Sequence, residues 1–108
     1  MISIRFERSH GCLVFFESKG HAEFEEEGLD IVCAAVSALS INAANSLEAF
    51  TDDTFTVDVG EDGYLSIRLP EVPSKEAQLL MESLALGLQA VEKDYGSQYV
   101  QVLIQEVS

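Results

Sequence analysis

A long uncharged segment constrains the fold of this chain more than any other feature of its sequence. No charged residue occurs between Asp30 and Glu48, although charged residues make up 23% of the 108-residue chain. Apolar residues recur through this segment at a helical period, so we predict a helix from Ile31 to about Phe50. Because a helix without charges over so many turns buries more than one side, we expect it to pack against a sheet and a second subunit.

Alternating apolar residues predict two β-hairpins, one on each side of this helix in the sequence. Residues 2–7 alternate, and a stretch rich in β-formers at 12–19 follows a turn. A second pair of alternating stretches, at 55–59 and 65–69, is joined by a short glycine-containing turn. Each half of the chain therefore begins with a hairpin.

A second helix and a last strand complete the predicted pattern. Ser74 is a favourable N-cap, Glu76 would lie in the first helical turn, and Gly96 follows the last periodic residue. Alternation at 100–104 predicts the final strand. The order ββαββαβ predicts a two-layer α+β fold with both helices on one face of a mixed sheet, and the chain length predicts a single domain, residues 1–108.

Charge and cysteine content narrow the expected partners and compartment. Six basic and nineteen acidic side chains give a net charge of -13, which disfavours nucleic acid and anionic membranes and favours a basic protein partner. The first residues do not follow the pattern of a secretory leader, so we expect neither secretion nor a membrane-spanning run. With no export signal, Cys12 and Cys33 are expected to be reduced thiols. We therefore predict a cytoplasmic protein.

Cys33, near the start of the predicted first helix, is the candidate nucleophile. Asp30 is a natural N-cap, which would place Cys33 in the first turn, where unpaired amides and the helix dipole favour a thiolate. His21 could take the thiol proton and later return a proton to a leaving group. A buried cysteine alone is more often an inert apolar residue, so the hypothesis depends on the whole cluster.

Small and polar residues beside these two would support the site. Ala34 has almost no side chain, so a substrate carbonyl could approach the amides at the helix start, which would hold an oxyanion. Ser37 would share the helix face of Cys33 and could hydrogen-bond a substrate. Gly20 and Ala22 flank His21. We include all four as supporting or substrate-binding residues.

Four glutamates, at 23 and 25–27, crowd the segment between His21 and Cys33. Their mutual repulsion would keep this loop open and mobile, and Gly28 would act as a hinge. A basic peptide would neutralise the glutamates and allow the loop to close. We therefore expect the segment to be a substrate lid.

At these residues the sequence resembles the ribosomal-processing cysteine proteases known as Prp. The family has two signatures, a Gly-His-Ala stretch and, after a short variable loop, an Asp-Ile-Val-Cys-Ala-Ala-Val-Ser stretch. They match Gly20–Ala22 and Asp30–Ser37 without a departure. The resemblance also extends over the whole length and element order of the chain.

The resemblance implies an activity and a role for each matched residue. Cys33 would be the nucleophile and His21 its base, with Asp30 and Ser37 supporting them. The enzyme would be a cysteine endopeptidase that removes the N-terminal extension of ribosomal protein number twenty-seven of the large subunit, cutting after a pair of aromatic residues. That substrate is basic, which suits a chain of net charge -13. The resemblance also favours a homodimer.

Three other hypotheses use the same residues. The chain could be a non-enzymatic ribosome-assembly or chaperone module whose acidic surface binds a basic protein. Cys33 could be a redox thiol with Cys12 as the resolving partner. His10, Cys12, His21 and Cys33 have the residue types of zinc ligands, but their spacing resembles no ordinary zinc site. We therefore expect no metal and no other cofactor.

Overall fold

The computed structural model describes residues 1–20, 29–61 and 63–108, and the chain follows the predicted order of strands and helices. The β1–β2 hairpin precedes α1, the β3–β4 hairpin precedes α2, and β5 comes last. The bounds are β1 (Ile2–Ser9), β2 (Cys12–Lys19), α1 (Leu29–Phe50), β3 (Thr56–Val59), β4 (Leu65–Arg68), α2 (Lys75–Tyr95) and β5 (Val100–Glu106).

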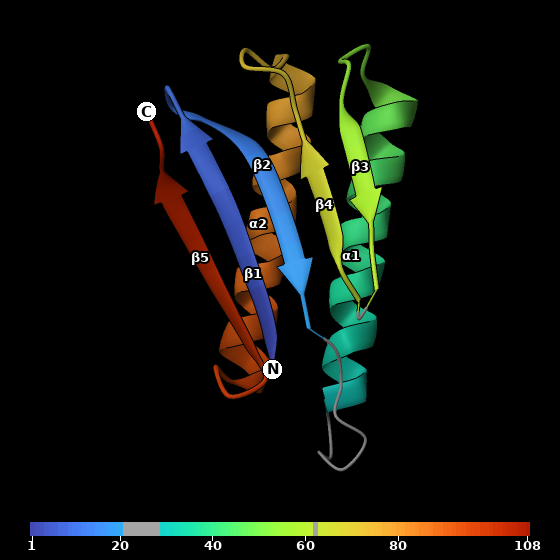
Figure 1. Cartoon of the computed structure of the whole chain (residues 1–108), viewed down its shortest axis with the longest axis vertical. Helices are drawn as coiled ribbons and strands as arrows, with labels where there is room; N and C mark the ends of the chain where they lie inside the picture. Colours follow the sequence, from blue (N-terminus) through green and yellow to red (C-terminus); the bar gives the residue numbers. More distant parts are fainter. Residues whose placement is uncertain (21–28, 62) are drawn as a thin grey trace.

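All the strands join in one sheet, and the two helices lie side by side on one of its faces (Figure 1). The strand order is β3-β4-β2-β1-β5. β1 and β5 are parallel, whereas the other neighbours are antiparallel, so the sheet is mixed. The prediction of a two-layer α+β fold with both helices on one face is confirmed.

The core lies between the sheet and the helices, because period-two alternation sends one set of strand side chains toward α1 and α2. Ile4 and Phe6 of β1 are at most 2% exposed, and the Phe6 ring centroid lies 5.2 Å from that of Phe16 in β2. The helices contribute Val32, Leu47 and other apolar residues to the same cluster. Within the described part of the chain, the opposite face of the sheet carries no helix (Figure 1).

α2 begins and ends where its local signals predict. The Ser74 side chain accepts a hydrogen bond from the amide of Ala77, and the amide of Gly96 donates to the carbonyl of Glu92. Gly96 has a φ of 109°, a conformation that glycine adopts without strain. These contacts satisfy backbone groups that the ends of a helix leave unpaired.

α1 buries one face and leaves the other open. Val32 and Leu47 are fully buried, whereas Ile31, Ile41 and Phe50 are 57%, 53% and 72% exposed. We expected no segment with the length and composition of a membrane span, and this expectation is wrong. The helical stretch from 30 to 50 is long and apolar enough, with a mean hydropathy of 1.3. Here that stretch packs one side into the core of the domain.

Candidate active site

Cys33 lies close to the start of α1, at a slightly different position from the predicted one. The helix begins at Leu29, so Asp30 lies inside the first turn and is not the N-cap. Its Oδ1 accepts a hydrogen bond from the neighbouring amide of Ile31, at 3.0 Å, and not from Val32 or Cys33. The sequence interpretation of Asp30 as a cap is therefore wrong, because the helix begins at Leu29, two residues before the start at Ile31 that a cap at Asp30 would give.

This shift changes which amides are free to hold an oxyanion. Cys33 is the fifth residue of α1, so its own amide bonds back to the first carbonyl of a regular helix. The unpaired amides belong to the preceding turn. Helical side chains lean toward the N-terminus, which directs the Cys33 side chain over that turn. Asp30 remains a favourable charge at the positive end of the helix.

The side of α1 that carries Cys33 is open to solvent on one flank. Cys33 is half-buried and packs against the hydrophobic core, whereas Ala34 and Ser37 are exposed. Residues one helical turn apart share a face, so the Ser37 hydroxyl lies on the same side as Cys33. A substrate could therefore approach Cys33 from this flank while the core holds the back of the side chain.

Gly20 terminates β2 in a conformation that suits glycine alone. Its φ is 96°, and a Cβ atom at this position would collide with the backbone carbonyl of Met1. Because Gly20 has no Cβ atom, the backbone at the end of β2 can pass close to the carbonyl of Met1. The predicted base His21, its neighbour Ala22 and the acidic segment 23–28 lie outside the described residues.

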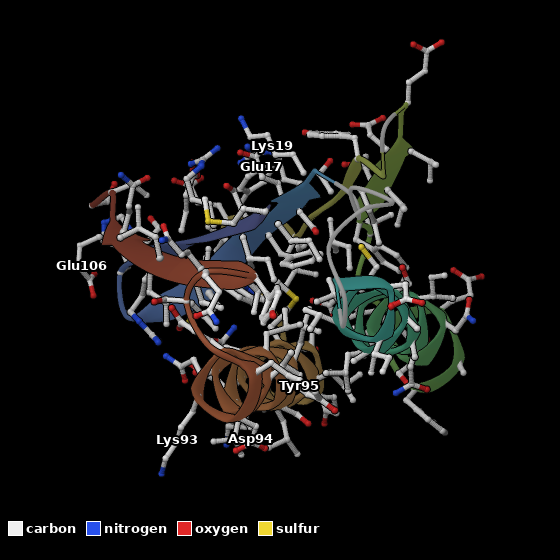
Figure 2. The ribbon with its side chains drawn as sticks, turned by 90° about the horizontal axis from the view of Figure 1, so that it is seen from below. Glu17, Lys19, Lys93, Asp94, Tyr95 and Glu106 are labelled. Atoms are coloured by element: carbon white, nitrogen blue, oxygen red, sulfur yellow. The ribbon has the colours of Figure 1, made fainter. Side chains whose placement is uncertain are left out.

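A cluster of polar side chains around Glu17 stabilises the end of β2 just before Gly20. The Glu17 carboxylate accepts hydrogen bonds from Arg5 Nε at 3.1 Å and from Tyr64 Oη at 3.0 Å, and Lys19 Nζ lies 3.7 Å away. Glu17 and Lys19 project from the sheet on the face away from the helices (Figure 2). The cluster links β1, β2 and the β3–β4 turn at the end of the sheet from which the Gly20 segment departs.

The charge state of this cluster follows from its contacts. Burial favours a raised pKa for Glu17, which is 7% exposed, but the hydrogen bonds from Tyr64 and Arg5 and the charges of Arg5 and Lys19 outweigh it. The pKa of Glu17 is therefore below its usual value. The carboxylate stays ionised at neutral pH and holds its partners in place.

A hollow of about 240 Å³ lies beside this cluster, but it is not a cleft for the nucleophile. Arg5, Glu17, Lys19 and Leu103 are among its lining residues. All four project from the face of the sheet that the helices do not cover, as their register with buried neighbours shows. α1, the helix that contains Cys33, lies on the other side of the sheet (Figure 1).

The two cysteines are far apart, which overturns two of the alternative hypotheses. Cys12 begins β2 at the β1–β2 turn, and α1 begins beyond the opposite end of that strand (Figure 1). A strand rises about 3.3 Å per residue, so eight residues place these ends far beyond the roughly 7 Å limit between disulfide-bonded Cα atoms. His10 lies beside Cys12. Cys12 and Cys33 therefore cannot form the redox pair, and they cannot ligate one zinc ion together.

The Glu17 cluster was not apparent from the sequence. Its signal was a carboxylate that directly follows the apolar residues 12–16 of β2, which is unusual for a buried strand. Its partners could not be assigned, because Arg5 and Tyr64 lie 12 and 47 residues away in the sequence.

Comparisons of sequence place these features in a known context. A family model described as cysteine protease Prp matches residues 1–101. The ribosomal processing cysteine protease Prp of Bacillus subtilis (strain 168) is 39% identical over 101 residues, which cover 88% of this chain and 90% of that protein. The protein of the same name from Staphylococcus aureus (strain Mu50) is 32% identical over 77 residues, covering 70% of this chain and 73% of that protein.

Solved structures agree with the sequence comparisons. A crystal structure from Streptococcus mutans has a TM-score of 0.84 and 36% identity, covering 98% of this chain and 95% of that chain. The Staphylococcus aureus protease Prp in complex with a substrate peptide has a TM-score of 0.89 and 25% identity, covering 97% of this chain and 100% of that chain. The same protease with a covalently linked product peptide has a TM-score of 0.86 and 26% identity, with 97% and 100% covered.

Proposed function

The chain belongs to the Prp family of ribosomal-processing cysteine proteases, and on this premise we propose that Cys33 is its nucleophile and His21 its general base. The observation that carries the proposal is the place of Cys33, which is half-buried near the start of α1 and open to solvent on the Ser37 flank. His21 follows Gly20 in the sequence, and Gly20 ends the strand that leads toward this helix.

The proposed reaction proceeds through an acyl-enzyme. His21 takes the thiol proton, and the Cys33 thiolate attacks the carbonyl carbon of the peptide bond. The free amides at the start of α1 stabilise the resulting oxyanion. His21 then gives its proton to the departing amine as the C–N bond breaks, leaving a thioester. It next removes a proton from water, which hydrolyses the thioester and restores the thiol.

The proposed substrate is the N-terminal extension of ribosomal protein number twenty-seven of the large subunit, cut after a pair of aromatic residues. The relatives are named for ribosomal processing, and one was solved with a substrate peptide. The net charge of -13 adds support, because it attracts a basic ribosomal protein.

The decisive experiment compares two cysteine variants on a synthetic peptide that spans the extension and the first mature residues. Cys33→Ala removes the nucleophile, so we expect cleavage to fall at least about 10³-fold. Cys12→Ala is the matched control, because Cys12 lies at the other end of β2, and it should cleave like the parent. Undiminished cleavage by Cys33→Ala, measured by mass spectrometry, would contradict the proposal.

The same experiment separates the protease from an acidic chaperone, which the net charge of -13 also favours. A chaperone would bind the extended ribosomal protein in a salt-dependent manner and would keep this binding after alkylation of Cys33. It would leave the peptide intact. Cleavage that disappears on alkylation therefore assigns the enzyme, and binding without cleavage assigns the chaperone.

We also propose that the protein is cytoplasmic, as the sequence predicts, and that its working form is a homodimer, which the exposed face of α1 supports. Ile31 and Ile41 are more than half exposed, and Ala38, which is also exposed, has a small side chain that allows close packing. Ile41→Glu should therefore give a monomer in sedimentation equilibrium with the fold intact, whereas Leu79→Glu on the outer face of α2 should leave the dimer unchanged. A parent chain that sediments as a monomer would contradict this part of the proposal.

A further inference from the structure

The outer edge of β3 presents free backbone groups in a regular array. In its antiparallel pairing with β4, Thr56 lies opposite Arg68 and Val57 opposite Ile67. The amide of Gly60 donates a hydrogen bond to the carbonyl of Tyr64. In an antiparallel ladder every second residue bonds to the partner strand, so Thr56 and Asp58 bond to β4, whereas Val57 and Val59 do not. The N–H and C=O groups of Val57 and Val59 therefore point away from β4.

No strand covers this edge among the residues that the structure describes. Val57 is 39% exposed and Val59 is 78% exposed, and the strand carries no lysine, proline or bulge to discourage pairing. An unpaired edge of this kind accepts an extended peptide through main-chain hydrogen bonds, and pockets for alternate side chains supply specificity.

The edge leads toward the catalytic end of the molecule. Val59 is level with Leu65 in β4, and Leu65 is level with Ser18 in β2, two residues before Gly20. β3 also runs in the same direction as β2, because both are antiparallel to β4. α1 begins beyond the β3–β4 turn (Figure 1). A peptide that pairs with β3 and continues past Val59 thus heads toward the start of α1.

The side chains of this edge face the same side of the sheet as the nucleophile. Val57 lies opposite the buried Ile67, so it shares the face that the helices cover. A peptide strand added beside β3 would place every second side chain on that face. These side chains would meet the exposed Val57 and Val59, which offer an apolar surface to large substrate residues.

Charge indicates the kind of peptide that this edge accepts. Residues 51–61, which comprise β3 and its flanks, contain four acidic residues and no basic one. Asp52, Asp58 and Glu61 are exposed. The other free edge, at β5, carries two glutamines and one acidic residue, Glu106, which lies 3.7 Å from Arg8 Nε; it lies across the sheet, beyond β1. Charge complementarity therefore favours the binding of a basic peptide at the edge of β3 over binding at the edge of β5.

We infer that an extended, basic segment of the substrate adds to β3 as a further strand, held by the backbone of Val57 and Val59, and that this edge sets the register of the scissile bond at Cys33. The inference rests on the proposed function for its choice of substrate. The backbone array and the acidic flank are independent of the catalytic role of Cys33.

Amide hydrogen exchange tests the inference directly. The Cys33→Ala protein is mixed with a synthetic peptide of the ribosomal extension, and exchange is followed by NMR. The amides of Val57 and Val59 should exchange at least about tenfold more slowly at saturating peptide, because each gains a hydrogen-bond partner. The outward amides of Val102 and Ile104 on β5 are the matched control and should not change.

A proline variant provides the kinetic arm. The Val57 amide bonds to no strand, so Val57→Pro should keep the fold, with its thermal unfolding as the check. We expect KM for the peptide to rise roughly tenfold with kcat little changed, since one backbone hydrogen bond is lost. Glu106→Pro, whose amide also points outward from β5, should leave both constants unchanged.

The outcomes separate this inference from the proposed function. Cleavage by the parent without protection of Val57 and Val59 overturns the inference and leaves the protease intact. Protection without cleavage by the parent keeps the pairing of the peptide with β3 but overturns the protease and, with it, the role of this edge in setting the scissile bond. Absence of both overturns both proposals. Protection that appears on raising the protein concentration alone assigns the edge to a second copy of the chain and also overturns the inference.

Discussion

The two helices cover the same face of the sheet and are nearly equal in length, at 22 and 21 residues, yet they are built differently. α2 has a side-chain cap at Ser74, a glycine stop at Gly96 and charges that suit the helix dipole at both ends. α1 has no charged residue between Asp30 and Glu48 and no basic residue in its last turn. α2 is therefore built to stabilise the single chain.

The outer surfaces of the two helices also differ, because α2 exposes polar residues among its apolar ones and α1 exposes an uncharged surface. α2 exposes Leu79 and Leu86, but Glu76 and Gln89 on the same helix are also exposed. α1 exposes an unbroken uncharged surface that runs from Ile31 to beyond Ile41. Exposed apolar surface of this kind contributes nothing to the stability of a single chain, so its value lies in contacts with other molecules.

The largest expected effect contrasts a buried residue of α2 with an exposed residue of α1. Leu88 is fully buried, so Leu88→Ala should lower the free energy of unfolding by about 3 kcal/mol through lost burial and the cavity left behind. Ile41→Ala should change it by less than about 0.5 kcal/mol in dilute protein. Urea unfolding measures both. A concentration-dependent loss for Ile41→Ala would show that a second copy already covers this face.

The next effect concerns the helix starts. Ser74→Ala removes the cap of α2 and the hydrogen bonds that Ser74 Oγ makes with Asp53 and Ala77, so we expect a loss of about 1 kcal/mol. Asp30→Ala on α1 removes only a contact with the adjacent amide and should cost a few tenths of a kcal/mol. Equal losses in thermal or urea unfolding would mean that Asp30 supports α1 as a true cap.

These helix starts also show what the sequence could and could not predict. The Ser74 cap and the Gly96 stop are local signals, and both were confirmed. Asp30 carries the same kind of signal, but α1 begins before it, since a cap residue type does not guarantee cap geometry. The backbone array at Val57 and Val59 was equally hidden, because pairing register arises from contacts between strands and not from residue type.

Acid should weaken the start of α2 through Asp53. Hydrogen bonds from the Ser74 side chain and backbone lower the pKa of Asp53. A lowered folded-state pKa means that the unfolded chain binds protons first, so this stabilisation is complete above the unfolded pKa and is lost as pH falls through the folded one. Stability measured by urea unfolding from pH 7 to pH 3 should therefore fall more steeply in the parent than in Asp53→Asn.

Ser74→Ala serves as the matched control for this pH dependence. It removes one of the donors that lower the pKa of Asp53, so its profile should lie between those of the parent and Asp53→Asn. A Ser74→Ala profile as steep as that of the parent would assign the acid sensitivity to other carboxylates. Glu17, whose pKa is also below its usual value, would then be the first to examine, through Glu17→Gln.

The smallest effect returns to the core side of α1. Ser40 is 1% exposed, and its hydroxyl has no hydrogen-bond partner among the described residues. Ser40→Ala removes this unsatisfied group and improves helix propensity, whereas Ser83→Ala on the exposed side of α2 changes propensity alone. Ser40→Ala should therefore stabilise the protein by about 0.5 kcal/mol more than Ser83→Ala in urea unfolding. Equal gains would mean that the Ser40 hydroxyl has a hydrogen-bond partner in solution, and that the buried polar groups of α1 are as well hydrogen-bonded as those of α2.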